Sequence, residues 1–207
     1  MDTSELKGNW ALILGASSGF GEAVSLRLAR EGMNIFGVHL DRKATLPNVE
    51  RISSEIEKSG SEAIFFNINA AGHEERAKVI EQIDTKLSNS STKIKIMLHS
   101  LAFGTLKPFI SEDKNDSINA KQMEMTLDVM AHSLVYWTQE LVLKNLFSQN
   151  ARIFAMTSAG GHRIWPTYGA VSAAKAALES HIRQLSVELA KKKITANSIQ
   201  AGVTDTQ

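Results

Sequence analysis

The chain has 207 residues, of which 43% are hydrophobic and 22% are charged, enough to bury one hydrophobic core in a single domain. Its net charge of +1 gives no field that would attract nucleic acid or an anionic membrane surface. Cysteine is absent, which excludes disulfides and thiolate metal sites, and no run of about 18 apolar residues could span a bilayer. Because the N-terminus is polar and unlike a signal peptide, we expect a cytoplasmic protein without membrane or nucleic-acid partners.

Short apolar runs alternate along the chain with longer segments of helical period, which is typical of a parallel sheet covered by helices. The six predicted strands cover 10–14, 34–38, 63–67, 94–98, 152–156 and 195–199, and the predicted helices lie near 20–31, 48–59, 73–87, 121–148 and 169–192. Gly32 and Gly60 stand where the first two helices should end. We therefore predict one α/β domain, residues 1–207, with a Rossmann-like, doubly wound parallel sheet in the order 3-2-1-4-5-6.

A glycine-rich turn follows the first predicted strand and opens the first predicted helix. It consists of Gly15, Ala16, Ser17, Ser18, Gly19, Phe20 and Gly21. Gly15 permits a tight exit from the strand, Gly21 permits close helix packing, and the amides at the helix start can receive pyrophosphate oxygens. A turn without a ligand is the alternative. The strand before it and the helix after it favour a dinucleotide site.

Three side chains suited to acid–base chemistry occur in the second half of the chain. Tyr168 and Lys175 are seven positions apart, and Ser158 lies ten positions before the tyrosine. At about 100° per residue, seven residues return to within about 20° of the start, so the phenol and the ammonium share a helix face. A nearby ammonium lowers a phenol pKa from its ordinary value of about 10. Each residue alone would pack or face water, but together with the glycine turn they indicate a nicotinamide-dependent reductase.

The glycine turn, with Ser158, Tyr168 and Lys175 in that order, resembles the short-chain dehydrogenase/reductase family, and the resemblance extends along nearly the whole chain. The segment His99 to Phe103 and the Tyr-x6-Lys spacing are similar to the enoyl-acyl carrier protein reductase branch, whereas most carbonyl-reducing members have Tyr-x3-Lys. The resemblance implies that Tyr168 acts as oxyanion partner and acid, that Lys175 lowers its pKa and binds the nicotinamide ribose, and that Ser158 assists positioning. Met130 stands near the position where many relatives carry an asparagine, which also favours the enoyl reading.

A tyrosine displaced by about one helical turn makes chemical sense for an enoyl substrate. Hydride addition to the β-carbon of an enoyl thioester creates negative charge on a more distant enolate oxygen, which a displaced phenol could meet. We therefore predict NAD(P)H-dependent reduction of an enoyl thioester of acyl carrier protein or coenzyme A, in fatty-acid synthesis. Reduction of a carbonyl substrate, such as a 3-ketoacyl thioester, and nucleotide binding without turnover are the two alternatives.

The resemblance also implies which residues contact the coenzyme. They are Gly15, Ser17, Ser18, Gly19, Phe20, Gly21, His39, Arg42, Asn69, Ala70, Ser100, Leu101, Ala102, Lys175, Gly202, Val203 and Thr206. His39 stands where NAD-preferring relatives have an acid, and Arg42 or Lys43 could pair with a 2′-phosphate. Asp41 would instead repel that phosphate or bind a ribose hydroxyl. On balance this pattern favours NADP(H) over NAD(H).

Relatives in this family continue past the position of Gln207 through a helical segment that covers the substrate and a seventh strand. The resemblance therefore implies that the chain is C-terminally incomplete and lacks the seventh strand. Scattered histidines without ligand spacing predict no metal site. An alanine-rich helix face around Lys175 is compatible with the homodimer or homotetramer contacts that family members commonly make.

Overall fold

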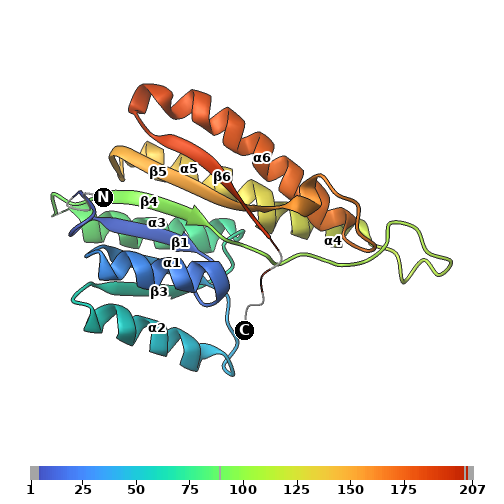
Figure 1. Cartoon of the computed structure of the whole chain (residues 1–207), viewed down its shortest axis with the longest axis horizontal. Coiled ribbons are helices and arrows are strands. Elements are labelled where there is room, and N and C mark those ends of the chain that lie inside the picture. Colours follow the sequence, from blue (N-terminus) through green and yellow to red (C-terminus); the bar gives the residue numbers. More distant parts are fainter. Residues whose placement is uncertain (1–4, 89, 203, 205–207) are drawn as a thin grey trace.

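Figure 1 shows the computed structural model, which describes residues 5–88, 90–202 and 204. Its strands are β1 (Trp10–Leu14), β2 (Asn34–His39), β3 (Ala63–Asn67), β4 (Ile94–His99), β5 (Phe147–Ser158) and β6 (Thr195–Ala201). They form one sheet in the order β3-β2-β1-β4-β5-β6, with every neighbouring pair parallel. The predicted Rossmann-like sheet, with six strands in the described part of the chain, is therefore confirmed.

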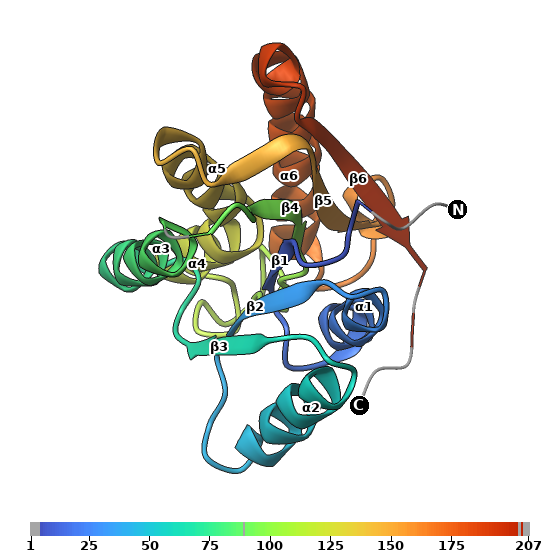
Figure 2. The same cartoon turned by 90° about the vertical axis from the view of Figure 1, so that its left-hand side faces the viewer.

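Helices cover both faces of this sheet (Figure 2). They are α1 (Gly19–Arg30), α2 (Leu46–Lys58), α3 (His73–Ser88), α4 (Ala120–Leu127), α5 (Ser133–Leu143) and α6 (Gly169–Leu189). Helices α1 and α2 pack on one face through a core that includes Ile13, Ile52 and Ile56. The other helices pack on the opposite face. Because all strands point the same way, the loops that leave their carboxyl ends gather at one edge, where a doubly wound fold binds its ligand.

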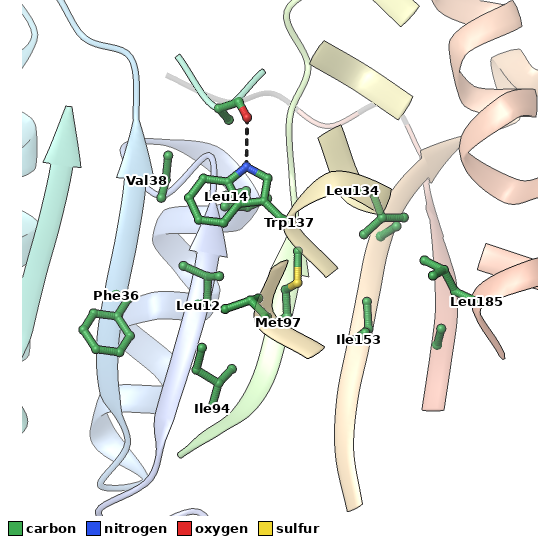
Figure 3. Close-up of a cluster of buried hydrophobic side chains, with 14 of the residues drawn as sticks. Leu12, Leu14, Phe36, Val38, Ile94, Met97, Leu134, Trp137, Ile153 and Leu185 are labelled. Carbon is green, nitrogen blue, oxygen red and sulfur yellow. Dashed lines mark hydrogen bonds between the residues drawn. The ribbon is translucent and has the colours of Figure 1, made fainter. Parts of the chain in front are cut away.

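The larger core lies under α3, α5 and α6 and is centred on Trp137. This indole is fully buried, and Figure 3 shows it among Leu12, Leu14 and Leu134. Its Nε1 donates a hydrogen bond of 2.8 Å to the backbone carbonyl of Ala70, in the loop after β3. The side chain therefore ties α5 to the edge of the sheet where the strands end, in addition to filling volume.

The predicted helix over 121–148 is wrong in two respects. A π-helical turn, Asp128–His132, separates α4 from α5, and the backbone N–H of Ser133 bonds the carbonyl of Asp128, five residues back. The helix also ends at Leu143, because Asn145 adopts a left-handed conformation with φ of 54° and the chain turns into β5 at Phe147. Strand β5 is accordingly longer than the predicted 152–156. By contrast, Gly32 and Gly60 have the positive φ expected of residues that end helices.

Among the described residues, no helix is both long and apolar enough to cross a bilayer. That part of the chain also gathers no group of three or more His, Asp or Glu side chains suited to hold a metal ion.

Replacing Trp137 by Phe should lower the free energy of unfolding by about 1–3 kcal/mol, because the Ala70 carbonyl loses its buried donor and the core loses volume. Denaturant titration of the purified protein measures this change. The matched control is Trp165→Phe, at a position 36% exposed, where the same substitution should change stability by less than about 0.5 kcal/mol. Equal effects at the two positions would contradict the assigned role of the buried hydrogen bond.

Candidate active site

The glycine turn between β1 and α1 is built so closely that side chains cannot enter it. A Cβ on Gly21 would lie 1.8 Å from the carbonyl oxygen of Gly15, and a Cβ on Gly15 would lie 2.4 Å from that of Ser100. Gly15 also has a φ of +90°, which side-chain-bearing residues rarely adopt. The turn therefore brings the first residues of α1 tightly against the ends of β1 and β4, with free amides at the helix start.

A cleft of about 860 Å³ opens beside this turn. Its lining combines the turn with residues that follow β2 and open α2, and includes Ser17, Ser18, Gly19, Phe20, Glu22, Asp41, Thr45, Asn48, Arg51 and Thr204. Asn48 braces the turn, since its Nδ2 donates to the Ser17 carbonyl at 2.7 Å. Polar groups and helix-start amides in a cleft of this size suit the phosphates and adenosine of a dinucleotide.

Asp41 supplies one of the carboxylates that line this cleft, and four neighbouring residues hydrogen-bond to it. Its Oδ2 lies 2.9 Å from Nδ1 of the buried His39, and its backbone exchanges two hydrogen bonds of 2.9 and 3.0 Å with the Asn67 side chain. Partial burial raises the pKa of Asp41, but hydrogen bonds from Thr45, Ser17 and His39 outweigh it and lower the pKa below its ordinary value. An ionised acceptor therefore faces the cleft at neutral pH.

A second cleft, of about 260 Å³, lies further along the strand ends, and Phe20 lines both clefts. Its lining contains the three predicted catalytic residues, Ser158, Tyr168 and Lys175, together with Ser100, Leu101, Ala102, Gly104, Leu106, Met130, Met156, Thr157, Val171, Ala201 and Gly202. Ser158 ends β5, Tyr168 is the N-cap of α6, and Lys175 lies two turns into that helix. The fold thus brings acid–base groups to one side of the expected dinucleotide path.

Lys175 is a nearly buried cation, with 5% of its surface exposed. Its Nζ donates to the backbone carbonyls of Met156 at 2.8 Å and Leu101 at 3.3 Å. Burial lowers the pKa of this amine to about 8. The group stays largely protonated at pH 7 but is less stable as a cation than a surface lysine, as expected for a functional lysine held away from water.

The ring of Tyr168 is positioned by the loop between β5 and α6. A Cβ on Gly160 would lie 2.2 Å from Cε1 of Tyr168, and the Trp165 ring meets the tyrosine edge-on with centroids 5.2 Å apart. Directly before the tyrosine, Thr167 has a φ of 63°, a strained conformation for a β-branched residue. Such strain next to a candidate acid indicates that the loop is selected to present this side chain.

Thr157 and His162, on either side of Ser158, are held by Glu179, a residue that the sequence analysis did not select. Thr157 Oγ1 donates to Glu179 Oε1 at 2.7 Å, and His162 Nε2 lies 3.0 Å from Glu179 Oε2. The Ser158 hydroxyl accepts a 3.2 Å hydrogen bond from the Gly160 N–H. Glu179 lies one helical turn beyond Lys175. Through these two contacts it anchors both ends of the segment that carries Ser158. Its position relative to Lys175 is the only signal from which sequence reasoning could have found it.

Several residues predicted to bind the coenzyme lie outside the two clefts. His39 is buried behind Asp41, Arg42 is exposed, and neither lines the cleft. Asn69 uses its side chain to accept from the Ala71 N–H, and Ala70 is buried under Trp137. Val203 and Thr206 lie outside the described residues. Asp41, which lines the first cleft, and Asn67, which bonds its backbone, could have been recognised as polar residues at the ends of neighbouring strands.

The fold and the two adjoining clefts define a dinucleotide-binding protein of the Rossmann type. A family model described as enoyl-(acyl carrier protein) reductase matches residues 15–207, and the chain belongs to this family within the short-chain dehydrogenases/reductases.

Individual relatives are similar at low identity. A 1-cyclohexenylcarbonyl-CoA reductase of Streptomyces collinus is 24% identical over 94% of this chain, which spans 64% of that relative. The NADH-dependent enoyl-[acyl-carrier-protein] reductase of Aquifex aeolicus is 27% identical over 97% of this chain and 71% of its own length. A short-chain dehydrogenase of Burkholderia cenocepacia, solved with NADP, superposes with a TM-score of 0.82 over 97% of this chain and 76% of its own, at 22% identity.

The buried amine predicts an unusual pH dependence of stability. Because the pKa of Lys175 falls from 10.5 to about 8 on folding, the unfolded chain binds more protons between these pH values, and the free energy of unfolding rises with pH there. Relative to Lys175→Met, the unaltered protein should gain about 2 kcal/mol between pH 7 and 9.5. Denaturant titrations at both pH values measure this gain. The exposed control Lys191→Met should show none, and a pH-independent difference for Lys175→Met would contradict the burial argument.

Proposed function

We propose that the protein catalyses NAD(P)H-dependent reduction of the carbon–carbon double bond of an enoyl thioester. The observation that carries this proposal is the cleft that holds Ser158, Tyr168 and Lys175 beside the glycine-turn cleft, with the tyrosine at the start of α6 and the lysine seven residues on. The two relatives named as enoyl-type reductases support the same reading.

The residues present fit a nicotinamide dinucleotide. Gly15 and Gly21 let the turn pack closely, so that the start of α1 and its amides lie beside the cleft where the pyrophosphate would bind, and Asp41 offers an acceptor to a ribose hydroxyl. The reduced nicotinamide would supply the hydride for the β-carbon of the substrate. Lys175, with one N–H directed to the ribose, would keep a positive charge next to Tyr168, and the phenol would donate a hydrogen bond to the thioester oxygen as it gains negative charge. The hydroxyl of Ser158, which lines the same cleft, would assist in positioning the substrate.

Exposed apolar side chains on the two segments that flank this cleft suit an acyl chain, and Leu106 among them lines the cleft. Phe103, Leu106 and Ile110 are exposed on the segment after β4, and Ile164 is fully exposed on the loop before α6. Exposed apolar groups that cluster near a site commonly mark a binding surface. The thioester carrier, acyl carrier protein or coenzyme A, the homodimeric or homotetrameric assembly, the role in fatty-acid synthesis and the cytoplasmic location remain parts of this proposal.

Carbonyl reduction is the second candidate, and one observation favours it. The hydroxyl of Ser158 lines the same cleft as the phenol of Tyr168, so both groups could hydrogen-bond the oxygen of one carbonyl group. Oxidation of NAD(P)H by a crotonyl thioester supports the first candidate, and oxidation by an acetoacetyl thioester supports the second. Coenzyme binding without turnover on either substrate would indicate a protein that binds nucleotide without catalysis.

Tyr168→Phe should lower the rate of crotonyl thioester reduction at least about 100-fold, because the developing oxyanion loses its donor, while the Kd for NAD(P)H stays within about twofold. Stopped-flow absorbance at saturating coenzyme and fluorescence titration measure the two quantities. The chain has a single other tyrosine, Tyr136, which lies outside both clefts, so Tyr136→Phe is the matched control and should keep its activity. Unchanged turnover in Tyr168→Phe would contradict the proposed role of Tyr168 as the donor to the oxyanion.

The choice of coenzyme depends on the charges that line the first cleft. The ionised Asp41 faces it, Glu22 also lines it, and Arg51 is already paired with Glu22 and Glu55. Neither Arg42 nor Lys43, the two cations expected to pair with a 2′-phosphate, lines it. The geometry thus favours a ribose diol over a 2′-phosphate and hence NAD(H), against the direction inferred from the sequence.

Asp41→Asn should therefore change the coenzyme preference, because it removes the negative charge nearest the adenosine ribose. The ratio of the Kd for NADPH to the Kd for NADH should fall about tenfold, equivalent to about 1.4 kcal/mol. Fluorescence titration with both coenzymes measures this ratio. Asp116→Asn, on the exposed loop before α4, is the control and should leave it unchanged. A ratio that does not fall would show that Asp41 does not discriminate.

A further inference from the structure

His99, the last residue of β4, is a fully buried titratable group to which the proposed mechanism gives no task. Its Nε2 lies 2.8 Å from Oγ of Ser133, at the start of α5. Its Nδ1 is the one buried side-chain polar atom in the described part of the chain that lacks a hydrogen-bond partner. Buried polar atoms are nearly always paired, so this nitrogen requires an explanation.

The contacts of Ser133 fix which nitrogen of His99 carries the proton. The Ser133 hydroxyl donates its single hydrogen to the Val129 carbonyl, 2.8 Å away inside the π-helical turn. It can therefore only accept from His99, so the imidazole proton is on Nε2 and Nδ1 is a bare acceptor. Burial and the nearby charge of Lys175 lower the pKa of His99 to about 3, which keeps the ring neutral at ordinary pH.

Lys175 is a donor group in the neighbourhood of this acceptor, since its charge acts on the imidazole of His99. Nδ1 is the ring nitrogen next to the Cβ attachment, so it lies close to the end of β4. The ammonium of Lys175 bonds the carbonyls of Leu101, two residues further on, and Met156, which follows the β5 partner of His99. These two carbonyls use two of its three N–H groups, and the 3.3 Å contact to Leu101 is the weaker one.

We propose that His99 is a positioning residue for Lys175, whose ammonium donates to the bare Nδ1 through one bridging water. The neutral ring would then hold the amine at the strand ends without adding charge, while Ser133 fixes the ring. The contact to Leu101 is the one that a coenzyme ribose could replace. This inference deepens the proposed function, because it explains how a buried lysine is kept in place for the coenzyme and the phenol.

Among the other ionisable groups on the elements around this pair, Glu179, His132 and His181 are engaged with other partners. Glu179 bonds Thr157 and His162, and His132 lies 3.0 Å from His181, its partner on α6. Asp128 is half-buried on the π-helical turn, and Tyr168 lines the cleft. A change in the titration of Lys175 on replacing His99 is therefore assigned to the loss of its acceptor.

The test follows Lys175 itself, in the coenzyme-free protein, by NMR with ¹³C-labelled lysine, and Lys175→Met assigns its signal. In His99→Leu, which lacks an acceptor, the midpoint of Lys175 should fall by about one pH unit. In His99→Asn, whose Oδ1 replaces Nδ1, it should return toward the original value. Equal midpoints in the unaltered protein and a folded His99→Leu overturn the proposal, as does failure of His99→Asn to restore it.

A second measurement remains available if His99→Leu fails to fold. In ¹⁵N-histidine spectra, His99 should show the Nε2–H tautomer and no protonation from pH 5 to 9. Ser133→Ala should mix the tautomers and lower the Lys175 midpoint, whereas an Nδ1–H tautomer in the unaltered protein overturns the proposal. Both experiments omit coenzyme and substrate, so absence of reductase activity would refute the proposed function without deciding this inference.

Discussion

The burial of one ammonium group, that of Lys175, is the constraint on which the rest of the site depends. A cation removed from water is unfavourable unless hydrogen bonds compensate, and the fold supplies carbonyls of Met156 and Leu101 at the ends of two neighbouring strands. Leu101 lies beyond the end of β4, and the pairing of β4 with β5 stops at His99 and Ala155, one residue before Met156. The position of the amine is therefore set by the sheet itself, and α6 contributes the side chain that reaches it.

The loop between β5 and α6, which carries the tyrosine that must meet this amine, is also held by several contacts. Glu179 fixes Thr157 and His162 at its two sides, and Gly160 lets the Tyr168 ring approach the backbone closely. Thr167, which directly precedes the tyrosine in this loop, keeps its left-handed φ of 63° although its side chain is exposed. A lysine held by strand ends and a tyrosine held by a braced loop form a preorganised pair, which is what stabilisation of a developing oxyanion requires.

The fold was predictable because its signals are local. Apolar runs such as Trp10–Leu14 and the stops at Gly32 and Gly60 are read directly from the sequence, and the structure confirms the sheet order. The π-helical turn and the end of the helix at Leu143 could not be predicted, because apolar residues recur at helical spacing over the whole of 121–148. A one-residue change in hydrogen-bond register, and a left-handed Asn145, leave no mark in such a pattern.

The candidate site likewise contains residues that the sequence predicts and residues that only the structure reveals. Ser158, Tyr168 and Lys175 follow from spacing, whereas Glu179 and the His99–Ser133 pair depend on contacts between elements far apart in sequence. His39 and Asp41 show the difference most clearly. Counting positions from the glycine turn selects His39, but alternation along β2 turns its side chain inward, where it supports Asp41 instead.

The structure also changes the meaning of the seven-residue spacing. The sequence argument treats Tyr168 and Lys175 as members of one helix face, yet α6 begins at Gly169 and the tyrosine is its N-cap, with φ of −87° and ψ of 2°. The phenol is therefore aimed by the loop and by Trp165 as much as by helical periodicity. A residue at a helix boundary can be displaced along the axis without disturbing the helix that carries the lysine. That freedom offers a physical route by which one family could move its acid relative to a fixed amine and so meet a more distant oxygen.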